Sequence, residues 1–197
     1  MNKFIKKSIL AGLLISLAGF AFLRCESKLM GAFLFSFGLI GVFILEANLY
    51  TGKVGYIESK RSVFDLVKIL VLNLVTAFGV GLIYRFAIGT TSAFDSRMTK
   101  DWFQLFVDSV GCGILIYIAV EFWKSTKNVI PVIICVMAFI LGGMEHSIAD
   151  MFYLGTSTLT LEGFLRIGVI VIGNGVGSIL IRLLQRGWKN EVPKSLL

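Results

Sequence analysis

The sequence contains few of the residues that build catalytic and metal sites. In 197 residues it has one histidine, three cysteines and two prolines. Cys25, Cys112 and Cys135 are scattered, with neither a disulfide framework nor the spacing of metal ligands. One imidazole with a few nearby carboxylates offers too few ligands for a metal transporter. We therefore expect no bound metal and no other cofactor.

Motifs for nucleophilic catalysis are also absent. The chain has no Gly-x-Ser-x-Gly segment. Ser147 adjoins the single histidine, His146, but neighbouring residues on a helix point in different directions. Ser147 and His146 therefore do not form a nucleophile–base pair, and we expect a protein that is not an enzyme.

The composition also lacks the polar surface of a soluble domain, because 56% of the residues are apolar and only 16% are charged. The net charge of +7 does not indicate a nucleic-acid partner, since the basic residues flank apolar runs instead of lining one face. The N-terminus imitates a secretory signal. Large residues, Phe22, Leu23 and Arg24, precede Cys25 where cleavage requires small ones, so we expect a retained first span.

Six apolar segments approach the ~20 residues that a helix needs to cross a bilayer. They cover residues 8–23, 29–47, 64–86, 103–123, 129–154 and 164–184. The short connections predict one transmembrane domain over residues 1–197. With the N-terminus inside, thirteen Lys and Arg lie in inner segments and six in outer ones. This bias predicts a multi-pass protein of the cell (inner) membrane whose short termini, about 1–7 and 186–197, are cytoplasmic.

Two of the six segments are interrupted. The fifth has thirteen apolar residues before Gly142-Gly143, which reach only ~20 Å of the ~30 Å hydrocarbon core. The second meets Glu46, Asn48 and Thr51 before its apolar content ends. A break in lipid leaves backbone groups unpaired and survives only where it lines a cavity or packs inside protein. We predict breaks near residues 47–51 and 143–147 that face one central cavity.

The two breaks occupy equivalent places in the first and last three segments. Asn73 follows Asn48 by 25 residues, and Asn174 follows His146 by 28. This predicts an all-α membrane protein of six transmembrane helices in an inverted three-plus-three repeat, with the second and fifth helices broken. The N-terminus of each second half-helix carries a partial positive charge, so two of them aimed at the midplane favour a small anion.

Four segments together resemble the formate/nitrite transporter family: EANLYTGK, LNLVTAFG, GMEHSIADMF and IGNGVGS. EHSIADMF is close to that family's most specific motif, and LYTG resembles its Leu-Phe-Thr-Gly loop. The resemblance covers essentially the whole chain. It implies an aquaporin-like protomer with its own pore, embedded in the lipid bilayer as part of a homopentamer, that passes small monovalent anions of weak acids.

The resemblance also implies roles for individual residues. His146 matches the central pore histidine, Thr51 the threonine of the loop that breaks the second helix, and Asn174 the asparagine of the sixth span. Leu49 and Tyr50 directly precede Thr51. The residues that fall where the family has constrictions are Phe35, Leu39 and Phe139, and Lys100 loosely matches a lysine of the outer approach. The chain departs from the family's pattern at Asn48, which replaces a frequent acid, and at Asp150, which replaces an asparagine.

Simple electrostatics gives these residues a common purpose. A bare anion in a low-dielectric constriction costs many kcal/mol, which fixed dipoles or protonation must offset. Histidine, with an ordinary pKa of ~6.5, exchanges protons near neutral pH, so His146 either protonates the anion or holds positive potential. We expect Phe35, Leu39 and Phe139 on the outer side of His146 and Leu49 and Tyr50 on the inner side.

Several assignments have structural alternatives. The phenylalanines are either constriction or packing residues, and Lys100 is either a pore residue or a solvated loop charge. Asn73 and Asn174 either hold the broken loops or touch substrate. We expect structural support from Asn48, Asn73, Glu145 and Asp150, with Glu145 facing away from the pore.

The resemblance therefore implies a channel or transporter for formate, nitrite, hydrosulfide or a short carboxylate. The residues leave the particular anion open, and also whether transport is channel-like or proton-coupled. The alternative is an aquaporin-like channel for small neutral solutes. Such a channel needs Asn-Pro-Ala loops, and neither Pro131 nor Pro193 follows an asparagine.

Overall fold

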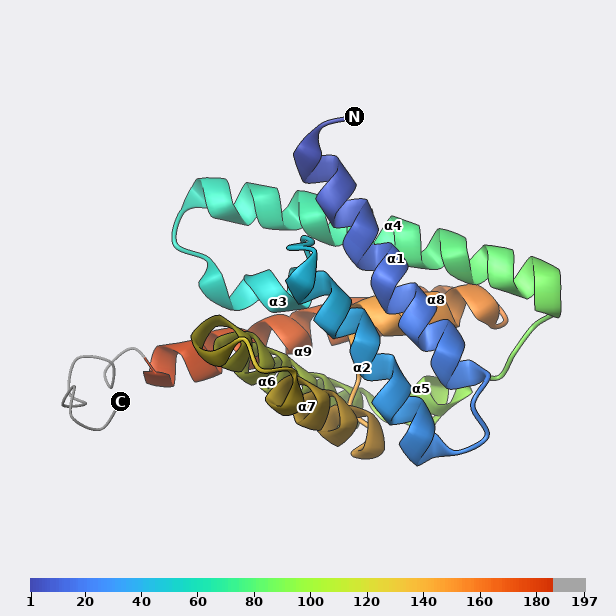
Figure 1. Ribbon diagram of the computed structural model, residues 1–197. Coiled ribbons are helices and arrows are strands. Elements are labelled where there is room, and N and C mark those ends of the chain that lie inside the picture. Colours follow the sequence, from blue (N-terminus) through green and yellow to red (C-terminus); the bar gives the residue numbers. More distant parts are fainter. Residues whose placement is uncertain (186–197) are drawn as a thin grey trace.

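The computed structural model describes residues 1–185, and every regular element in that range is helical (Figure 1). The expected C-terminal tail, 186–197, lies outside the described residues. In chain order the elements are α1 (Lys3–Leu23), α2 (Lys28–Ile44), α3 (Tyr50–Lys53), a 3-10 turn η1 (Val54–Tyr56), α4 (Lys60–Ile88), α5 (Asp95–Thr99), α6 (Trp102–Thr126), α7 (Val129–Leu141), α8 (Ser147–Thr156) and α9 (Leu161–Gln185).

Four of these helices, α1, α4, α6 and α9, are long and apolar enough to cross a membrane. The shortest of them, α1, has 21 residues and so reaches ~31 Å. Two further apolar helices are shorter, with 17 residues in α2 and 13 in α7. Large apolar side chains are highly exposed, for example Phe86, Leu161 and Phe103. This surface suits hydrocarbon better than water, so the chain is a membrane protein.

The two shorter apolar helices, α2 and α7, reach ~26 Å and ~20 Å, short of a ~30 Å hydrocarbon core. α2 ends at Ile44, and the next helix begins at Tyr50; α7 ends at Leu141, and α8 begins at Ser147. Each link turns through a residue with positive φ, Glu46 at 48° and Gly143 at 69°. Glycine adopts this conformation without strain, whereas glutamate does so at a cost.

The segments after the two links differ in length. α8 continues for ten residues, whereas α3 has four and passes into the three-residue turn η1. The expectation of two opposed helix N-termini is therefore wrong on one side, because a single turn sums few peptide dipoles. Gly52 and Gly55 lie in this short segment, where glycine weakens helix, and Gly55 allows the close approach of the Tyr117 ring.

The long helices form two sets, and a short element of each set packs against a long helix of the other. α1 packs on α2 and α4, and α6 packs on α7 and α9; α8 then lies along α4, and η1 lies against α9 (Figure 1). Glycines allow the closest approaches. A Cβ at Gly12 would press on Asn73 and Thr76, and a Cβ at Gly113 would collide with the Asn174 backbone. Small residues at such crossings let helix backbones pack closely in a membrane.

Candidate functional site

The histidine lies at the link between α7 and α8, almost fully buried. His146 is the N-cap of α8, and its Nδ1 accepts a hydrogen bond from the backbone N–H of Ala149 at 3.2 Å. A nitrogen that accepts a hydrogen bond carries no proton, so this contact selects the neutral imidazole protonated at Nε2. Nε2 lies 2.9 Å from Thr51 Oγ1 and therefore donates to that hydroxyl.

The His146–Thr51 contact joins the two interrupted segments directly, although 95 residues separate them in the chain. Phe139, seven residues before His146 near the end of α7, stacks on the imidazole at 5.9 Å between ring centroids. Phe35 of α2 meets Phe139 edge-on at 6.1 Å. One apolar ring thus covers a face of the imidazole, and a second ring packs against the first.

One asparagine amide holds each link. Asn73 of α4 donates to the carbonyls of Ser8 and Asn48, at 2.7 and 3.0 Å, and accepts from the Tyr50 N–H at 2.9 Å. The bonds to Asn48 and Tyr50 satisfy backbone groups of the link that no helix pairs, as a buried break requires, and the bond to Ser8 ties α4 to α1.

Asn174 of α9 makes the same set of contacts at the other link. It donates to the carbonyls of Ser109 and Glu145, both at 2.8 Å, and accepts from the Ser147 N–H at 2.9 Å. Every donor and acceptor of both side-chain amides points at backbone, so among the described contacts the asparagines hold the links and make no other hydrogen bond.

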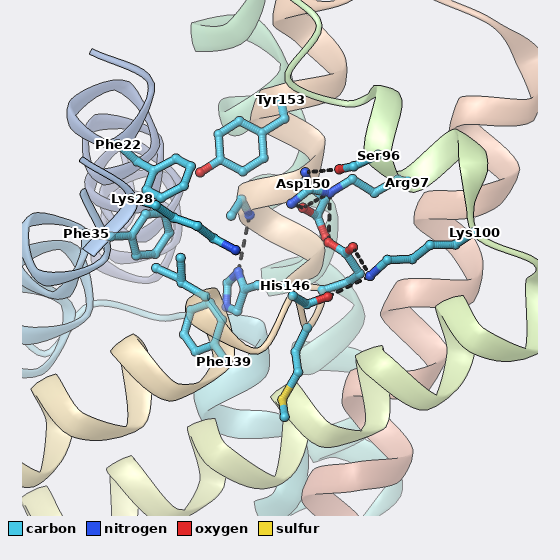
Figure 2. Close-up of a pocket in the computed structure, with 15 residues that line it drawn as sticks. Phe22, Lys28, Phe35, Ser96, Arg97, Lys100, Phe139, His146, Asp150 and Tyr153 are labelled. Carbon is cyan, nitrogen blue, oxygen red and sulfur yellow. Dashed lines mark hydrogen bonds and ion pairs between the residues drawn. The ribbon is translucent and has the colours of Figure 1, made fainter. Parts of the chain in front are cut away.

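A cavity of about 300 Å³ opens beside His146 (Figure 2). Phe35 and Phe139 lie on its wall together with three cations, Lys28, Arg97 and Lys100, and two acids, Glu145 and Asp150. Tyr153 and Phe22 complete the aromatic part of the wall. Charged and apolar surfaces therefore meet at the histidine.

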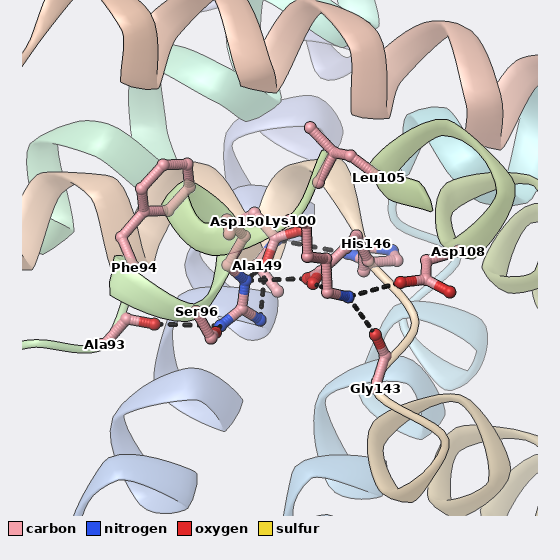
Figure 3. Close-up of polar contacts among 12 residues, drawn as sticks. Ala93, Phe94, Ser96, Lys100, Leu105, Asp108, Gly143, His146, Ala149 and Asp150 are labelled. Atoms are coloured by element: carbon pink, nitrogen blue, oxygen red, sulfur yellow. Dashed lines mark hydrogen bonds and ion pairs between the residues drawn. The ribbon is translucent and has the colours of Figure 1, made fainter. Parts of the chain in front are cut away.

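Two of the cations are bound to the acids. Arg97 approaches Glu145 Oε2 at 2.8 Å and Asp150 Oδ1 at 2.9 Å. Lys100 lies 2.6 Å from Glu145 Oε1, from Asp108 Oδ2 and from the Gly143 carbonyl (Figure 3). Buried carboxylates need such partners, because an uncompensated charge is strongly destabilising. Burial lowers the pKa of Lys100, but the hydrogen bonds and charges of Asp108 and Glu145 outweigh it, so the pKa is raised and Lys100 stays charged.

A second cavity, of about 170 Å³, is lined by Leu49, Ala47, Gly52, Glu46 and Lys53, among others. Glu46 pairs with Lys7 at 2.9 Å in an exposed salt bridge. Residues of the first link thus line this cavity, and residues of the second link line the cavity beside His146.

The structure brings most of the expected site residues together. Six of them line the first cavity, namely Phe35, Lys100, Phe139, Glu145, His146 and Asp150, and Thr51 touches His146 from the other side. The expectation that Glu145 faces away is wrong, because its carboxylate is on the cavity wall between Arg97 and Lys100. Asn48 donates to the Phe4 carbonyl at 3.4 Å.

Two expected residues lie slightly away from the cavities. Leu39 is buried within α2 and borders neither cavity. Tyr50 is turned toward α9, where its hydroxyl donates to the Val171 carbonyl at 3.1 Å and lies close to Gly175.

Sequence reasoning missed Arg97, the cation that binds both buried acids. One signal was available: two carboxylates inside an apolar run require cationic partners, and few outer basic residues exist. Within residues 1–185, no group of three or more His, Cys, Asp and Glu side chains is placed to hold a metal ion.

The family model described as formate/nitrite transporter matches residues 1–186. The chain belongs to the formate/nitrite transporter family. Members of this family are membrane channels and transporters, not enzymes. The motifs around Thr51 and His146, which carried the resemblance in the sequence, lie at the contact between the two links.

Individual relatives are distant in sequence and close in fold. The formate channel FocA of Haemophilus influenzae is 24% identical over 157 residues, which are 68% of this chain and 55% of that channel. The match therefore spans about half of that relative's length. A structure of a pentameric formate channel with formate bound has a TM-score of 0.82 at 19% identity and covers 95% of this chain and 96% of that chain. A second, described as an FNT family ion channel, has a TM-score of 0.76 at 22% identity over 96% and 88%.

Proposed function

We propose that this chain is a channel for small monovalent anions of weak acids, such as formate, nitrite, hydrosulfide or a short carboxylate. The observation that carries the proposal is the position of His146, at the inner end of a cavity with three cations and directly behind two phenyl rings. The cations attract the anion. The rings exclude water, so the anion would lose its hydration beside them. A polar hydrogen from His146 is required there to replace the lost water.

In this proposal the anion crosses between the two cavities at the His146–Thr51 contact. Phe35 and Phe139 form the outer constriction, and Leu49 forms the inner one. Leu39 supports the outer constriction from within α2, and Tyr50 fixes the inner link through its bond to Val171. Lys100 and Glu145 set the charge of the outer approach, with Asp150 balanced by Arg97.

The geometry of His146 favours electrostatic help over proton release. A neutral imidazole that donates its Nε2 hydrogen cannot also give up that proton without forming an unstable anion. Protonation of Nδ1 would require the ring to release the Ala149 N–H. We infer that His146 stabilises the anion as a hydrogen-bond donor through Nε2, whose hydrogen turns from Thr51 Oγ1 to the anion as it passes, and that proton transfer to the anion needs the cap of α8 to open.

We further propose that the architecture is an inverted repeat with a broken second and fifth helix. Equivalent contacts support this. Asn73 and Asn174 make the same three kinds of hydrogen bond, and the helix positions that they use or touch are separated by one constant interval. Ser109, Gly113 and Asn174 lie 101 residues after Ser8, Gly12 and Asn73. Three spans per unit is an odd number, so the second unit enters from the opposite side.

The assembly and orientation are part of the same proposal. The similar channel of known structure is described as pentameric, and large apolar side chains remain exposed on this protomer. We propose a homopentamer in the cell (inner) membrane, with both termini cytoplasmic and residues 1–197 forming one channel domain. Native mass spectrometry of the detergent-solubilised protein tests the stoichiometry, and a dimer as the largest species would contradict it.

Flux measurements test the function. Purified protein in liposomes should admit formate, nitrite, hydrosulfide, acetate or lactate faster than empty liposomes do, with chloride and glycerol as controls. Applying a proton gradient to the same vesicles separates channel-like from proton-coupled transport. The proposal is wrong if no weak-acid anion passes while water or glycerol does, which would indicate a neutral-solute channel.

A further inference from the structure

Within residues 1–185, Lys28 is the one cation on the wall of the cavity beside His146 that contacts no acid. The other two cations, Arg97 and Lys100, each lie within 3 Å of two carboxylates. Lys28 lies on the same wall and is exposed, with no ion pair, hydrogen bond or ring contact to another described side chain. Figure 2 shows its ammonium directed inward, toward His146.

The position of Lys28 in its helix makes this unusual. Lys28 is the first residue of α2, directly after the N-cap Ser27, and the first turn contains no acid. A cation at a helix N-terminus is unfavourable, because the macrodipole is positive there. Nothing in the described structure compensates Lys28, so local stability does not explain its presence.

The charges of the cavity give Lys28 an electrostatic effect of its own. Arg97 and Lys100 are balanced by Glu145 and Asp150 on the wall, with Asp108 also bound to Lys100. Without Lys28, the wall and Asp108 together carry one more negative than positive charge. An entering anion would then meet a repulsive field, and Lys28 cancels it.

We propose that Lys28 captures the anion at the cavity mouth and delivers it to His146, an inference that rests on the proposed function. The ammonium pairs with the oxyanion by charge and by N–H···O hydrogen bonds, and no covalent bond changes. Its four-carbon stem is flexible, which lets the bound anion move inward past Phe35. Because the pair is hydrated, it is weak, so capture does not become a trap.

The test compares three substitutions in liposome flux assays with formate. Lys28→Met should raise the half-saturating formate concentration roughly 2- to 5-fold, the range expected for a hydrated ion pair, with maximal flux little changed. Lys28→Arg should restore the wild-type value. The matched control is Arg24→Met, which removes an exposed cation from the same α1–α2 connection but not from the cavity wall, and should leave the value unchanged.

Salt dependence provides a second readout that a structural role would not change. Raising the ionic strength from about 20 mM to about 300 mM shortens the screening length several-fold. It should weaken formate capture in the wild type and in Arg24→Met, and much less in Lys28→Met. Equal half-saturation and equal salt dependence in Lys28→Met and Arg24→Met would overturn the proposal. Failure of the proposed function is distinct, because the wild type itself would then carry no formate.

Discussion

The two links between half-helices are held by the same three hydrogen bonds but present different residues. Asn73 fixes the backbone on either side of Leu49, and Asn174 does so on either side of His146. Next to Leu49 stands the neutral Asn48, whereas next to His146 stands Glu145, bound to Arg97 and Lys100. The amides therefore build a common frame, and the chemical function lies in what differs between the two links.

Loss of either asparagine tests the common frame and should have the largest effect. Asn73→Ala and Asn174→Ala each leave one buried N–H and one buried carbonyl of a link without partners, which costs on the order of 2 to 6 kcal/mol at ~1–3 kcal/mol per group. Thermal unfolding in detergent should show both variants strongly destabilised, by similar amounts. Asn128→Ala, which removes only the exposed cap of α7, is the control and should cost ~1 kcal/mol. Costs that differ widely between Asn73→Ala and Asn174→Ala would mean that the two links are not equivalent.

The frame was largely predictable from the sequence, because its causes are local. Gly142-Gly143 interrupts an apolar run of thirteen residues, and Asn73 and Asn174 recur at matching places. The structure places both asparagines at the links. The length of α3 was not predicted, since the segment after it packs against Tyr117 and α9, which are far away in the chain.

The site was predictable only in part. His146 and Thr51 stood out through the motifs that surround them. Arg97 did not stand out, because its role depends on long-range folding. The connection between α4 and α6 brings Arg97 to two acids that lie 48 and 53 residues further along the chain. The predicted orientation of Glu145 was wrong for the same reason, since its contact partners decide in which direction a link residue points. Periodicity gives no information where the chain is not helical.

The ion pairs near the two links differ in burial. Arg97→Met leaves Glu145 and Asp150 nearly buried without their guanidinium, which should cost about 3 kcal/mol, at the low end for a broken buried pair because Arg97 is 18% exposed. Adding Asp150→Asn should recover part of that stability. At the other link, Lys7→Met removes the partner of Glu46, a carboxylate that is itself 80% exposed, and should leave the melting temperature unchanged. A fall in melting temperature for Lys7→Met as large as that for Arg97→Met would contradict the difference in burial.

Replacing the histidine makes the two links chemically alike. His146→Leu gives the outer link the residue type of the inner one and should reduce formate flux roughly 10- to 100-fold, the value of a strong hydrogen bond. Leucine also removes the cap of α8, so His146→Asn is the companion variant, because asparagine caps helices well. Its stability should be near normal, while its flux remains low and loses the wild-type pH profile. Normal pH-dependent flux in His146→Asn would mean that His146 only caps α8.

The smallest expected effect is the pH dependence contributed by Lys100. Asp108 and Glu145 raise the pKa of Lys100 above its ordinary 10.5 despite the opposing effect of burial. A group whose pKa is raised on folding stabilises the protein fully below the unfolded pKa, and that stabilisation is lost as the pH rises through the folded pKa. The melting temperature of the wild type should therefore exceed that of Lys100→Gln at pH 8 to 9, with the gap closing above about pH 10.5. Because other lysines and tyrosines titrate in both proteins, only the difference between the two curves reports on Lys100. A gap that stays constant to pH 12 would show that Lys100 stabilises the loop by packing instead of by its charge.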